Sequence, residues 1–169
     1  MTRPTGARVR QTLFDILAPR LPGCRILDAF AGSGAIGLEA LSRGARLAVF
    51  VDSGTAAIAS IRANARALAP LRGEVLALRQ DARAALPALA AQGRRFDVVY
   101  LDPPYDSDLY EWALAAIDRS DLLAEGGVVV AEHFHKRVLP ETIGRLLRRR
   151  AVRVGDHVLG FYEMESGSP

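Results

Sequence analysis

Apolar runs and helix-like patterns alternate along most of the chain. The runs predict strands near residues 24–29, 46–52, 73–79, 96–101 and 127–132, followed by a closing antiparallel pair near 148–154 and 157–164. Between them, apolar residues at helical spacing predict helices near 35–43, 54–68, 82–91, 108–118 and 140–147. A further helix is expected near 7–18, where one apolar face is formed by Val9, Leu13, Ile16 and Leu17.

This alternation is typical of an α/β protein with helices on both faces of a mostly parallel sheet. Gly155 and Asp156 offer a tight turn between the last two runs. We therefore expect a doubly wound, mostly parallel seven-stranded sheet with a C-terminal antiparallel hairpin and an N-terminal helix, the Rossmann-like layout of class I methyltransferases. Residues 1–169 are expected to form one such domain, with the N-terminal motif and helix in 1–20 and a frayed tail at 165–169.

Composition narrows the class of protein. Half of the 169 residues are hydrophobic, which suits one compact core. No apolar run approaches the roughly 20 residues of a membrane span. The start of the chain also lacks the apolar stretch of a signal peptide, so a cytoplasmic protein is expected. The single cysteine, Cys24, excludes an internal disulfide and a thiolate metal cluster.

Arginine dominates the basic residues. Lys136 is the only lysine among 22 basic residues, and the sequence pI is about 9.5. Arginine suits phosphate binding and base stacking, but a coding bias toward arginine and alanine explains the same excess. Charge alone therefore does not establish a nucleic-acid partner.

Three glycines follow the first predicted strand at the spacing of a dinucleotide-binding loop. Gly32, Gly34 and Gly37 match G-x-G-x-x-G, and Asp52 falls near the position of a ribose-binding acid. Asp28, just before this loop, argues against a dinucleotide because its charge would repel a pyrophosphate. It suits a cationic ligand instead, and S-adenosylmethionine carries an ammonium and a sulfonium.

Acidic residues mark four successive strand ends. Asp28, Asp52, Asp81 and Asp102 fall at the edge of the sheet where open α/β proteins bind ligands. Asp52 can accept hydrogen bonds from both ribose hydroxyls of an adenosine, Asp81 can accept one from the adenine amino group, and the Ala82 N–H can meet a ring nitrogen. Each acid alone also fits a helix N-cap or a turn. The residues expected to bind the cofactor are Asp28, Ala29, Phe30, Gly32, Ser33, Gly34, Asp52, Ser53, Asp81 and Ala82.

The segment Asp102-Pro103-Pro104-Tyr105 matches the needs of methylating an exocyclic amine. Such a nitrogen must turn its lone pair toward the methyl group while both of its hydrogens are held. The Asp102 carboxylate and the Pro103 carbonyl are two suitable acceptors, and Pro104 restricts the direction of that carbonyl. Tyr105 offers a face on which a base stacks, so the target base must leave any helix or stack. These four residues are the predicted catalytic residues, and the reaction needs no metal.

Other features carry weaker signals. His133 and His135 fall on one face of a strand beside Glu132, but no third ligand is suggested, so a metal site is not expected. Glu132 is expected to shape the substrate side of the site. Tyr110 and Trp112 are expected to pack their own helix. The three arginines at 148–150 fit either a phosphate contact or a solvated junction between a helix and a strand.

The chain resembles the RsmD-type 16S ribosomal RNA guanine-N2 methyltransferases of bacteria. The segments that carry the resemblance are Arg3-Pro4-Thr5, Arg8-Val9-Arg10-Gln11-Thr12-Leu13-Phe14, 27–34, 37–44 and Asp102-Pro103-Pro104-Tyr105. The resemblance implies S-adenosylmethionine as methyl donor, a small-subunit rRNA guanine as acceptor, in free RNA or in an assembled small ribosomal subunit, and a role in ribosome maturation. In a monomeric enzyme of this kind, Arg3, Arg8 and Arg10 are expected to bind RNA phosphates.

Two other classes of function stay open at this point. A DNA adenine-N6 methyltransferase would need the same Asp-Pro-Pro-Tyr geometry, but the 64 residues after Tyr105 are consumed by the fold and leave no target-recognition region. A non-catalytic S-adenosylmethionine-binding or RNA-binding assembly factor is the other alternative, and Asp102 and Tyr105 speak against it. A protein-glutamine methyltransferase is also disfavoured, because that family has an Asn-Pro-Pro-Tyr motif where this chain has Asp102.

Overall fold

A computed structural model describes residues 5–166 of the chain. Arg3 of the N-terminal motif and residues 167–169 of the predicted tail lie outside the described residues. Within the described range, none of the helices is both long and apolar enough to cross a membrane.

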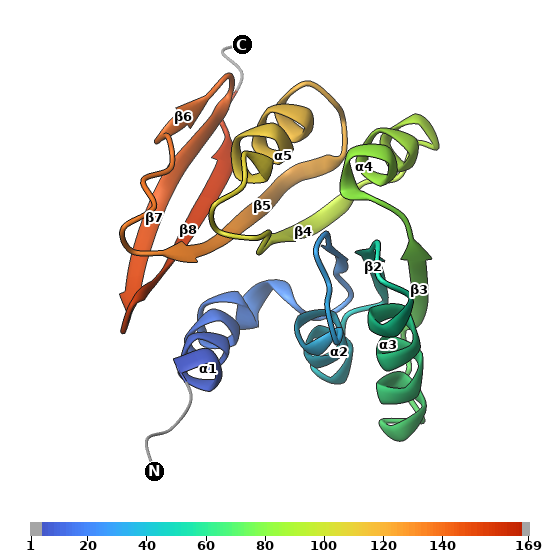
Figure 1. The fold of residues 1–169 in the computed structure, drawn as a ribbon. Helices are drawn as coiled ribbons and strands as arrows, with labels where there is room; N and C mark the ends of the chain where they lie inside the picture. Colours follow the sequence, from blue (N-terminus) through green and yellow to red (C-terminus); the bar gives the residue numbers. More distant parts are fainter. Residues whose placement is uncertain (1–4, 167–169) are drawn as a thin grey trace.

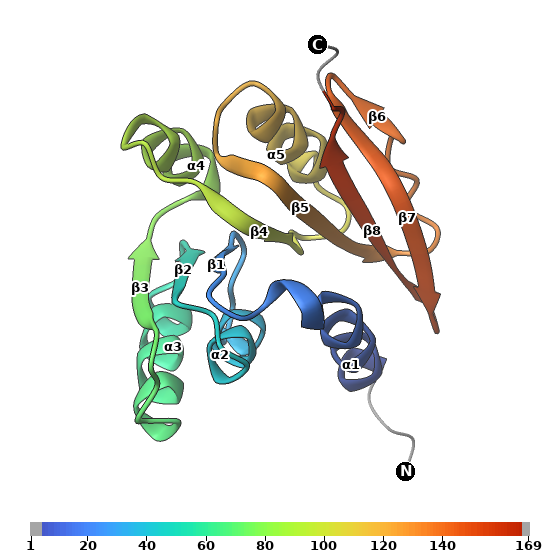
Figure 2. The ribbon, with the colours of Figure 1, turned by 180° about the vertical axis from the view of Figure 1, so that it is seen from behind.

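One eight-stranded sheet runs through residues 5–166 (Figure 1). Its strands are β1 (Arg25–Asp28), β2 (Leu47–Asp52), β3 (Glu74–Arg79), β4 (Phe96–Leu101), β5 (Leu123–Phe134), β6 (Thr142–Ile143), β7 (Leu146–Val154) and β8 (His157–Met164). They lie in the order β3-β2-β1-β4-β5-β8-β7-β6. The first five strands are parallel, and β8 is antiparallel to both of its neighbours. The strand order reverses between β1 and β4, side by side in Figure 2, and ligands of such sheets bind at this switch point.

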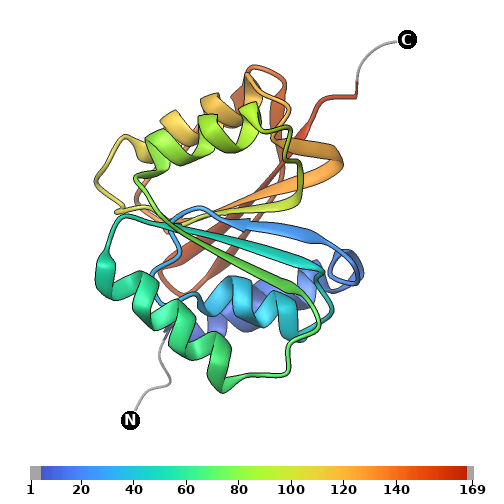
Figure 3. The ribbon, with the colours of Figure 1, turned by 90° about the vertical axis from the view of Figure 1, so that its right-hand side faces the viewer.

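Helices cover both faces of the sheet, as Figure 3 shows along its edge. They are α1 (Thr5–Leu17), α2 (Ala35–Ser42), α3 (Thr55–Ala67), α4 (Ala82–Ala91) and α5 (Leu109–Asp118), with the short 3-10 helix η1 (Ala18–Arg20) after α1. Strand β2 explains why two layers form. Its Phe50 belongs to a core cluster that also contains residues of α1, α2 and α3, whereas Val49 and Val51 belong to a second cluster that contains residues of α4 and α5. A strand buried on both faces needs a continuous apolar run, which is the pattern in the sequence.

The predicted helix near 140–147 is wrong, because this segment forms β6 and the start of β7. Ile143, Leu146 and Leu147 have helical spacing, but Gly144 adopts φ 57° and turns the chain between the two strands. Ile143 then pairs with Leu146, and Leu146 is fully buried in the core. The extra strand also makes the sheet eight-stranded rather than seven-stranded.

The C-terminal hairpin is confirmed. Val154 pairs with His157 across a two-residue turn, in which Gly155 adopts φ 58°. This hairpin inserts β8 beside β5, so that His157 lies opposite Phe134 at the end of β5. Residues from the last strand thereby reach the carboxyl edge of the parallel strands.

Candidate active site

The four acids predicted at strand ends do gather at the carboxyl edge of the parallel strands. Asp28 ends β1 and Asp52 ends β2, whereas Asp102 directly follows β4 and Asp81 lies two residues after the end of β3. Parallel pairing places these ends at one edge because Asp28 lies opposite Phe50 and Tyr100 in the register of β2 and β4. The edge therefore concentrates negative charge beside the switch point.

A first cavity, which we call the glycine-loop cavity, has a volume of about 430 Å³. It is lined by Ala29, Phe30, Gly32, Asp52, Ser53, Gln80, Asp81, Ala82, Asp102, Pro103, Pro104 and Leu109. Seven of the residues predicted to bind the cofactor share this wall with three predicted catalytic residues. Gln80 and Leu109 were not predicted, because neither residue belongs to a motif and only the fold brings them here.

Asp28, Ser33 and Gly34 are predicted cofactor residues that are not in the wall of this cavity. Asp28 is 1% exposed and accepts a hydrogen bond of 3.3 Å from the Gly37 N–H. Burial raises the pKa of Asp28 to about 7, and the nearby charge of Asp52 acts in the same direction. Ser33 lies in a separate surface depression with Arg10, and its carbonyl accepts a hydrogen bond from Asn64. Asp28 therefore lies within the fold behind the loop, and its predicted contact with a cationic ligand stays a prediction.

The glycine loop has the conformation that its sequence requires. Gly32 and Gly34 adopt φ angles of 56° and 84°, which residues with a side chain rarely adopt. Gly37 lies so close to β2 that a Cβ atom there would fall 2.4 Å from the Phe50 ring. The loop thus turns tightly from β1 into α2 and leaves backbone N–H groups near Asp52.

Asp52 and Asp81 are held by backbone N–H groups. The Asp52 carboxylate accepts hydrogen bonds from the N–H of Gly32 at 2.9 Å and of Gly54 at 2.8 Å. Asp81 caps α4 by accepting a hydrogen bond of 2.8 Å from the Arg83 N–H, so the helix-cap interpretation is correct for this residue. A carboxylate has about four lone-pair sites, so both groups keep acceptor capacity toward the cavity.

A second cavity, the aromatic cavity, lies on the β5 side of Asp102 and has a volume of about 300 Å³. Its walls are Asp102, Tyr105, Tyr110, His133, Phe134 and His157. Asp102 lines both cavities, so this residue lies where they meet. Tyr110 does pack in the core, as predicted, but it also forms part of this wall. His133, Phe134 and His157 were not predicted as site residues; their positions at the ends of β5 and at the hairpin are the signal that identifies them.

Asp102 is an exposed residue of both cavity walls, yet the surroundings of its carboxylate disfavour negative charge. Partial burial, together with the carboxylates of Glu132 and Asp28, raises the pKa of Asp102 to about 7. Glu132 ends up behind the cavity wall, where it accepts a hydrogen bond from the Tyr100 hydroxyl and lies 3.2 Å from His157 Nδ1. Burial first, and then the two neighbouring acids, thus disfavour the charged form of Asp102.

The segment after Asp102 is fixed by contacts on both sides. The Pro104 carbonyl accepts a hydrogen bond of 2.6 Å from the Ser107 hydroxyl, and Arg137 donates one of 3.1 Å to the Tyr105 carbonyl. Arg137 also pairs with Glu111 of α5. The Tyr105 side chain is 61% exposed and meets Phe134 edge-on at 6.1 Å. The backbone is therefore held while the aromatic face of Tyr105 stays available.

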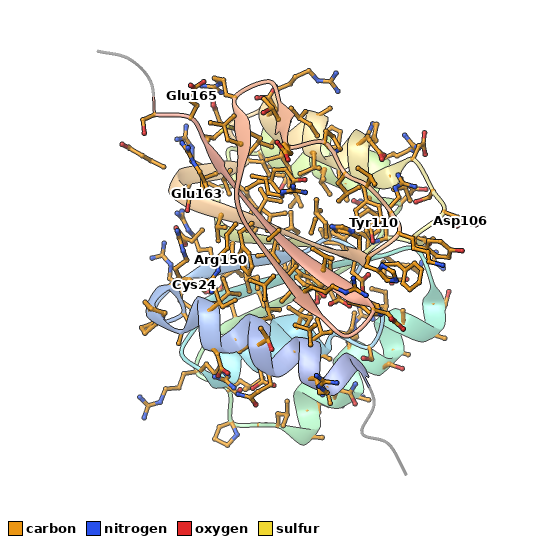
Figure 4. All side chains as sticks on the ribbon, turned by 90° about the vertical axis from the view of Figure 1, so that its left-hand side faces the viewer. Cys24, Asp106, Tyr110, Arg150, Glu163 and Glu165 are labelled. Atoms are coloured by element: carbon orange, nitrogen blue, oxygen red, sulfur yellow. The ribbon has the colours of Figure 1, made fainter. Side chains whose placement is uncertain are left out.

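Two of the three arginines that are predicted to bind nucleic acid, Arg8 and Arg10, lie within the described residues. On α1, Arg8 is exposed and Arg10 is partly buried in the depression that also holds Ser33. The arginines at 148–150 belong to β7, so the helix-to-strand junction predicted for them is wrong. Figure 4 places Arg150 on the side of Cys24, which precedes β1, and away from Tyr110 and Asp106. Arg150 therefore lies apart from Tyr110, a residue of the aromatic cavity wall.

Trp112 packs against the α4–α5 core cluster, as predicted. Among the described residues, no group of three or more His, Cys, Asp or Glu side chains is arranged to hold a metal ion.

A mostly parallel sheet that ends in an antiparallel hairpin is the layout of the class I methyltransferase fold, and here two cavities meet at an Asp-Pro-Pro-Tyr segment. The family model described as conserved hypothetical protein 95 matches residues 1–163, and the chain belongs to this family. YlbH of Bacillus subtilis is 40% identical over 154 residues, covering 91% of this chain and 83% of the relative. Ribosomal RNA small subunit methyltransferase D of Escherichia coli is 33% identical over 165 residues, covering 97% and 80%.

Solved structures agree with this assignment. A conserved hypothetical protein of Streptococcus pyogenes matches with a TM-score of 0.83 and 32% identity, covering 93% of this chain and 95% of that one. The Thermus thermophilus 16S rRNA N2 G1207 methyltransferase, in complex with AdoMet and guanosine, matches with a TM-score of 0.73 over 98% of this chain and 44% of its own. Because its sequence identity is only 22%, the second match supports a shared fold and nothing further.

Proposed function

We propose that this protein transfers a methyl group from S-adenosylmethionine to the exocyclic N2 amine of a guanine in small-subunit ribosomal RNA, in the bacterial cytoplasm. The observation that carries the proposal is that Asp102 lies in the walls of both cavities. One residue at the junction of a donor site and an acceptor site is what a direct transfer between two bound molecules requires. The names of the relatives support ribosomal RNA as the substrate.

The glycine-loop cavity fits S-adenosylmethionine by the chemistry of its walls. Asp52 offers acceptors for the two ribose hydroxyls. Asp81 and the Ala82 N–H, on the same wall, suit the adenine amino group and a ring nitrogen. When bound, S-adenosylmethionine supplies an electrophilic methyl group. The protein then has to place the acceptor nitrogen in line with that group and exclude competing nucleophiles.

The aromatic cavity supplies this placement. The Asp102 carboxylate and the Pro103 carbonyl accept the two hydrogens of the amine, so that its lone pair faces the glycine-loop cavity. Tyr105 provides an exposed ring for stacking, worth on the order of 1–3 kcal/mol per base. A base reaches this cavity only after it leaves its helix or stack. Catalysis then depends on positioning, with neither a metal nor a covalent intermediate.

Label transfer tests the proposal. Labelled S-adenosylmethionine is offered to free small-subunit rRNA, to assembled small subunits and to DNA, and the products are digested to nucleosides. We expect N2-methylguanosine from one or both ribosomal substrates. N6-methyladenine in DNA would instead establish an adenine methyltransferase, and S-adenosylmethionine binding without transfer to any substrate would establish an assembly factor.

Arg3, Arg8 and Arg10 are proposed to bind RNA phosphates beside this edge. Replacing all three with glutamine should weaken RNA binding and reduce its salt slope by up to about one unit per lost contact. Binding of the protein to rRNA is measured by fluorescence anisotropy over a salt series. S-adenosylmethionine affinity should hardly change in the same variant. An unchanged salt slope would assign these arginines to solvent.

A further inference from the structure

His133 has an unusual environment in the aromatic cavity. Its side chain lines the cavity, yet the residue is only 5% exposed. Its Nδ1 atom lies 3.0 Å from the Phe134 carbonyl oxygen, and its Nε2 atom is buried without a hydrogen-bond partner. A buried polar atom without a partner costs about 1–3 kcal/mol, so such an atom in a cavity wall points to a ligand that completes it.

The partner of Nδ1 decides what Nε2 can do. A carbonyl oxygen only accepts hydrogen bonds, so Nδ1 must carry the proton. Burial lowers the pKa of His133, which keeps the ring neutral. In a neutral imidazole with Nδ1 protonated, Nε2 bears a lone pair and acts as an acceptor. His133, a residue of the cavity wall, therefore carries an unused acceptor that an N–H or O–H donor would complete.

Two other polar groups of the cavity wall face Glu132, and of these His157 Nδ1 is, like His133 Nε2, buried without a hydrogen-bond partner. The Tyr110 hydroxyl donates a hydrogen bond of 2.6 Å to the Glu132 carbonyl, and His157 Nδ1 faces the Glu132 carboxylate at 3.2 Å. Asp102 is an acceptor when ionised. A ligand that suits this wall must present several donors along one edge.

We infer that His133 Nε2 accepts a hydrogen bond from the N1–H of the target guanine and thereby selects guanine over adenine. This inference rests on the proposed function. Guanine carries N1–H directly beside its N2 amine, so a base whose amine faces Asp102 presents a second donor to the same cavity. Adenine has a bare N1 beside its N6 amine, and two lone pairs would then oppose each other. Discrimination by an unpaired buried group is stronger than discrimination by shape.

The tautomer of His133 is the first test, and it needs no substrate. Two-bond proton–nitrogen NMR spectra of the labelled protein distinguish a protonated Nδ1 from a protonated Nε2. We expect Nδ1 to be protonated, which is the minor form of free histidine. A protonated Nε2 would make His133 a donor and overturn the inference.

Base discrimination is the second test. Guanosine and 2-aminopurine riboside both carry the N2 amine, but only guanosine has the N1–H. Both are titrated into the protein with bound S-adenosylhomocysteine, and the ratio of their affinities is compared between wild type, His133→Leu and the control His135→Leu. His135 lies in the turn directly after this strand and is not in the cavity wall. 2-Aminopurine riboside also lacks the O6 atom, but an acceptor such as His133 Nε2 can pair only with the N1–H. The ratio should therefore fall about tenfold or more in His133→Leu only.

A ratio that is equal in all three proteins would overturn the inference, even if wild type methylates guanine. Folding of each variant is checked by circular dichroism and by S-adenosylmethionine affinity. His133→Gln, which keeps an acceptor, should recover part of the guanosine preference. If wild type makes no methylguanosine in rRNA while Nδ1 is protonated and the ratio falls as expected, the proposed reaction fails and the base-reading role of His133 stands.

Discussion

Asp102 lies in the walls of both cavities. We expect it to hold the acceptor amine without contributing to cofactor binding. Asp102→Ala should reduce methyl transfer by roughly a hundredfold to a thousandfold, the scale of removing one preorganised polar contact. S-adenosylmethionine affinity, measured by calorimetry, should stay nearly unchanged because the carboxylate engages the amine. Tyr105→Phe should keep most activity, since the ring face rather than the hydroxyl is used.

Asp106 provides the matched control for this prediction. It is an exposed carboxylate in the same loop and lines neither cavity. Asp106→Ala should therefore transfer methyl groups at the wild-type rate. Full activity in Asp102→Ala would contradict the proposed positioning whatever the substrate.

The folded protein also disfavours the negative charge of Asp28. We expect this to change the free energy of unfolding with pH. The pKa of Asp28 rises from 3.8 to about 7 in the folded protein, chiefly through burial. Between these values the folded state holds a proton that the unfolded chain has released, so the free energy of unfolding falls as pH rises through this window. Below the window both states are protonated and the effect vanishes.

Asp28→Asn removes this titration while keeping the shape of the side chain. We expect the variant to be more stable than wild type at pH 8 by up to ~4 kcal/mol, and nearly equal to it at pH 4. Urea unfolding at the two pH values measures the difference. The same stability difference at both pH values would show that Asp28 is not the titrating group.

At the scale of elements, the contact of α2 with β2 sets the shape of the glycine loop. Gly37→Ala would place a Cβ atom 2.4 Å from the Phe50 ring, which is itself fully buried. Overpacking of this kind costs about 1–3 kcal/mol, more than the gain of about 1 kcal/mol from replacing glycine in a helix. Gly37→Ala should therefore lower the urea midpoint and weaken S-adenosylmethionine binding through the displaced loop.

Gly6 gives the control for this substitution. It lies in α1, and no atom lies within 4 Å of the position of its Cβ. Gly6→Ala should be neutral or slightly stabilising in the same urea titration. If both alanine variants gained stability, the close packing of α2 on Phe50 would be contradicted.

At the scale of the whole molecule, one continuous sheet joins the cofactor half to the hairpin half. We therefore expect residues 1–169 to unfold as one cooperative unit, and a ligand of the glycine-loop cavity to stabilise all of it. At a concentration one hundred times its Kd, S-adenosylmethionine should add about 2.7 kcal/mol and raise the Tm by about 5–10 °C. Differential scanning calorimetry measures both the number of transitions and the shift.

Asp52→Ala tests the origin of that shift. Loss of its charge-assisted contacts should weaken S-adenosylmethionine binding by more than about tenfold, so that the same concentration gives a smaller rise in Tm. A shift caused by NADH instead of S-adenosylmethionine would restore the dinucleotide interpretation of the glycine loop.

Local pattern was enough to predict much of this molecule. The apolar runs that form β1, β2 and β4 are mostly buried, which is typical of strands in a covered parallel sheet, whereas β3 at the sheet edge is only partly buried. The glycines at 32 and 34 and the Asp-Pro-Pro-Tyr segment carry backbone requirements within a few residues, so their loops were recognisable without tertiary information. Helical spacing misled at 140–147, where Gly144 and pairing with β7 outweighed the spacing of Ile143, Leu146 and Leu147.

Only the tertiary structure decided how the acceptor side is built. His133 and Phe134 come from β5, Tyr110 from α5 and His157 from β8, and no local signal links these segments. The burial of Asp28 behind the loop and the unpaired Nε2 of His133 are likewise set by long-range packing. The sequence determined the sheet and the motifs because those depend on neighbours along the chain, whereas the cavity walls depend on which distant strands pair, and strand order is a property of the folded molecule.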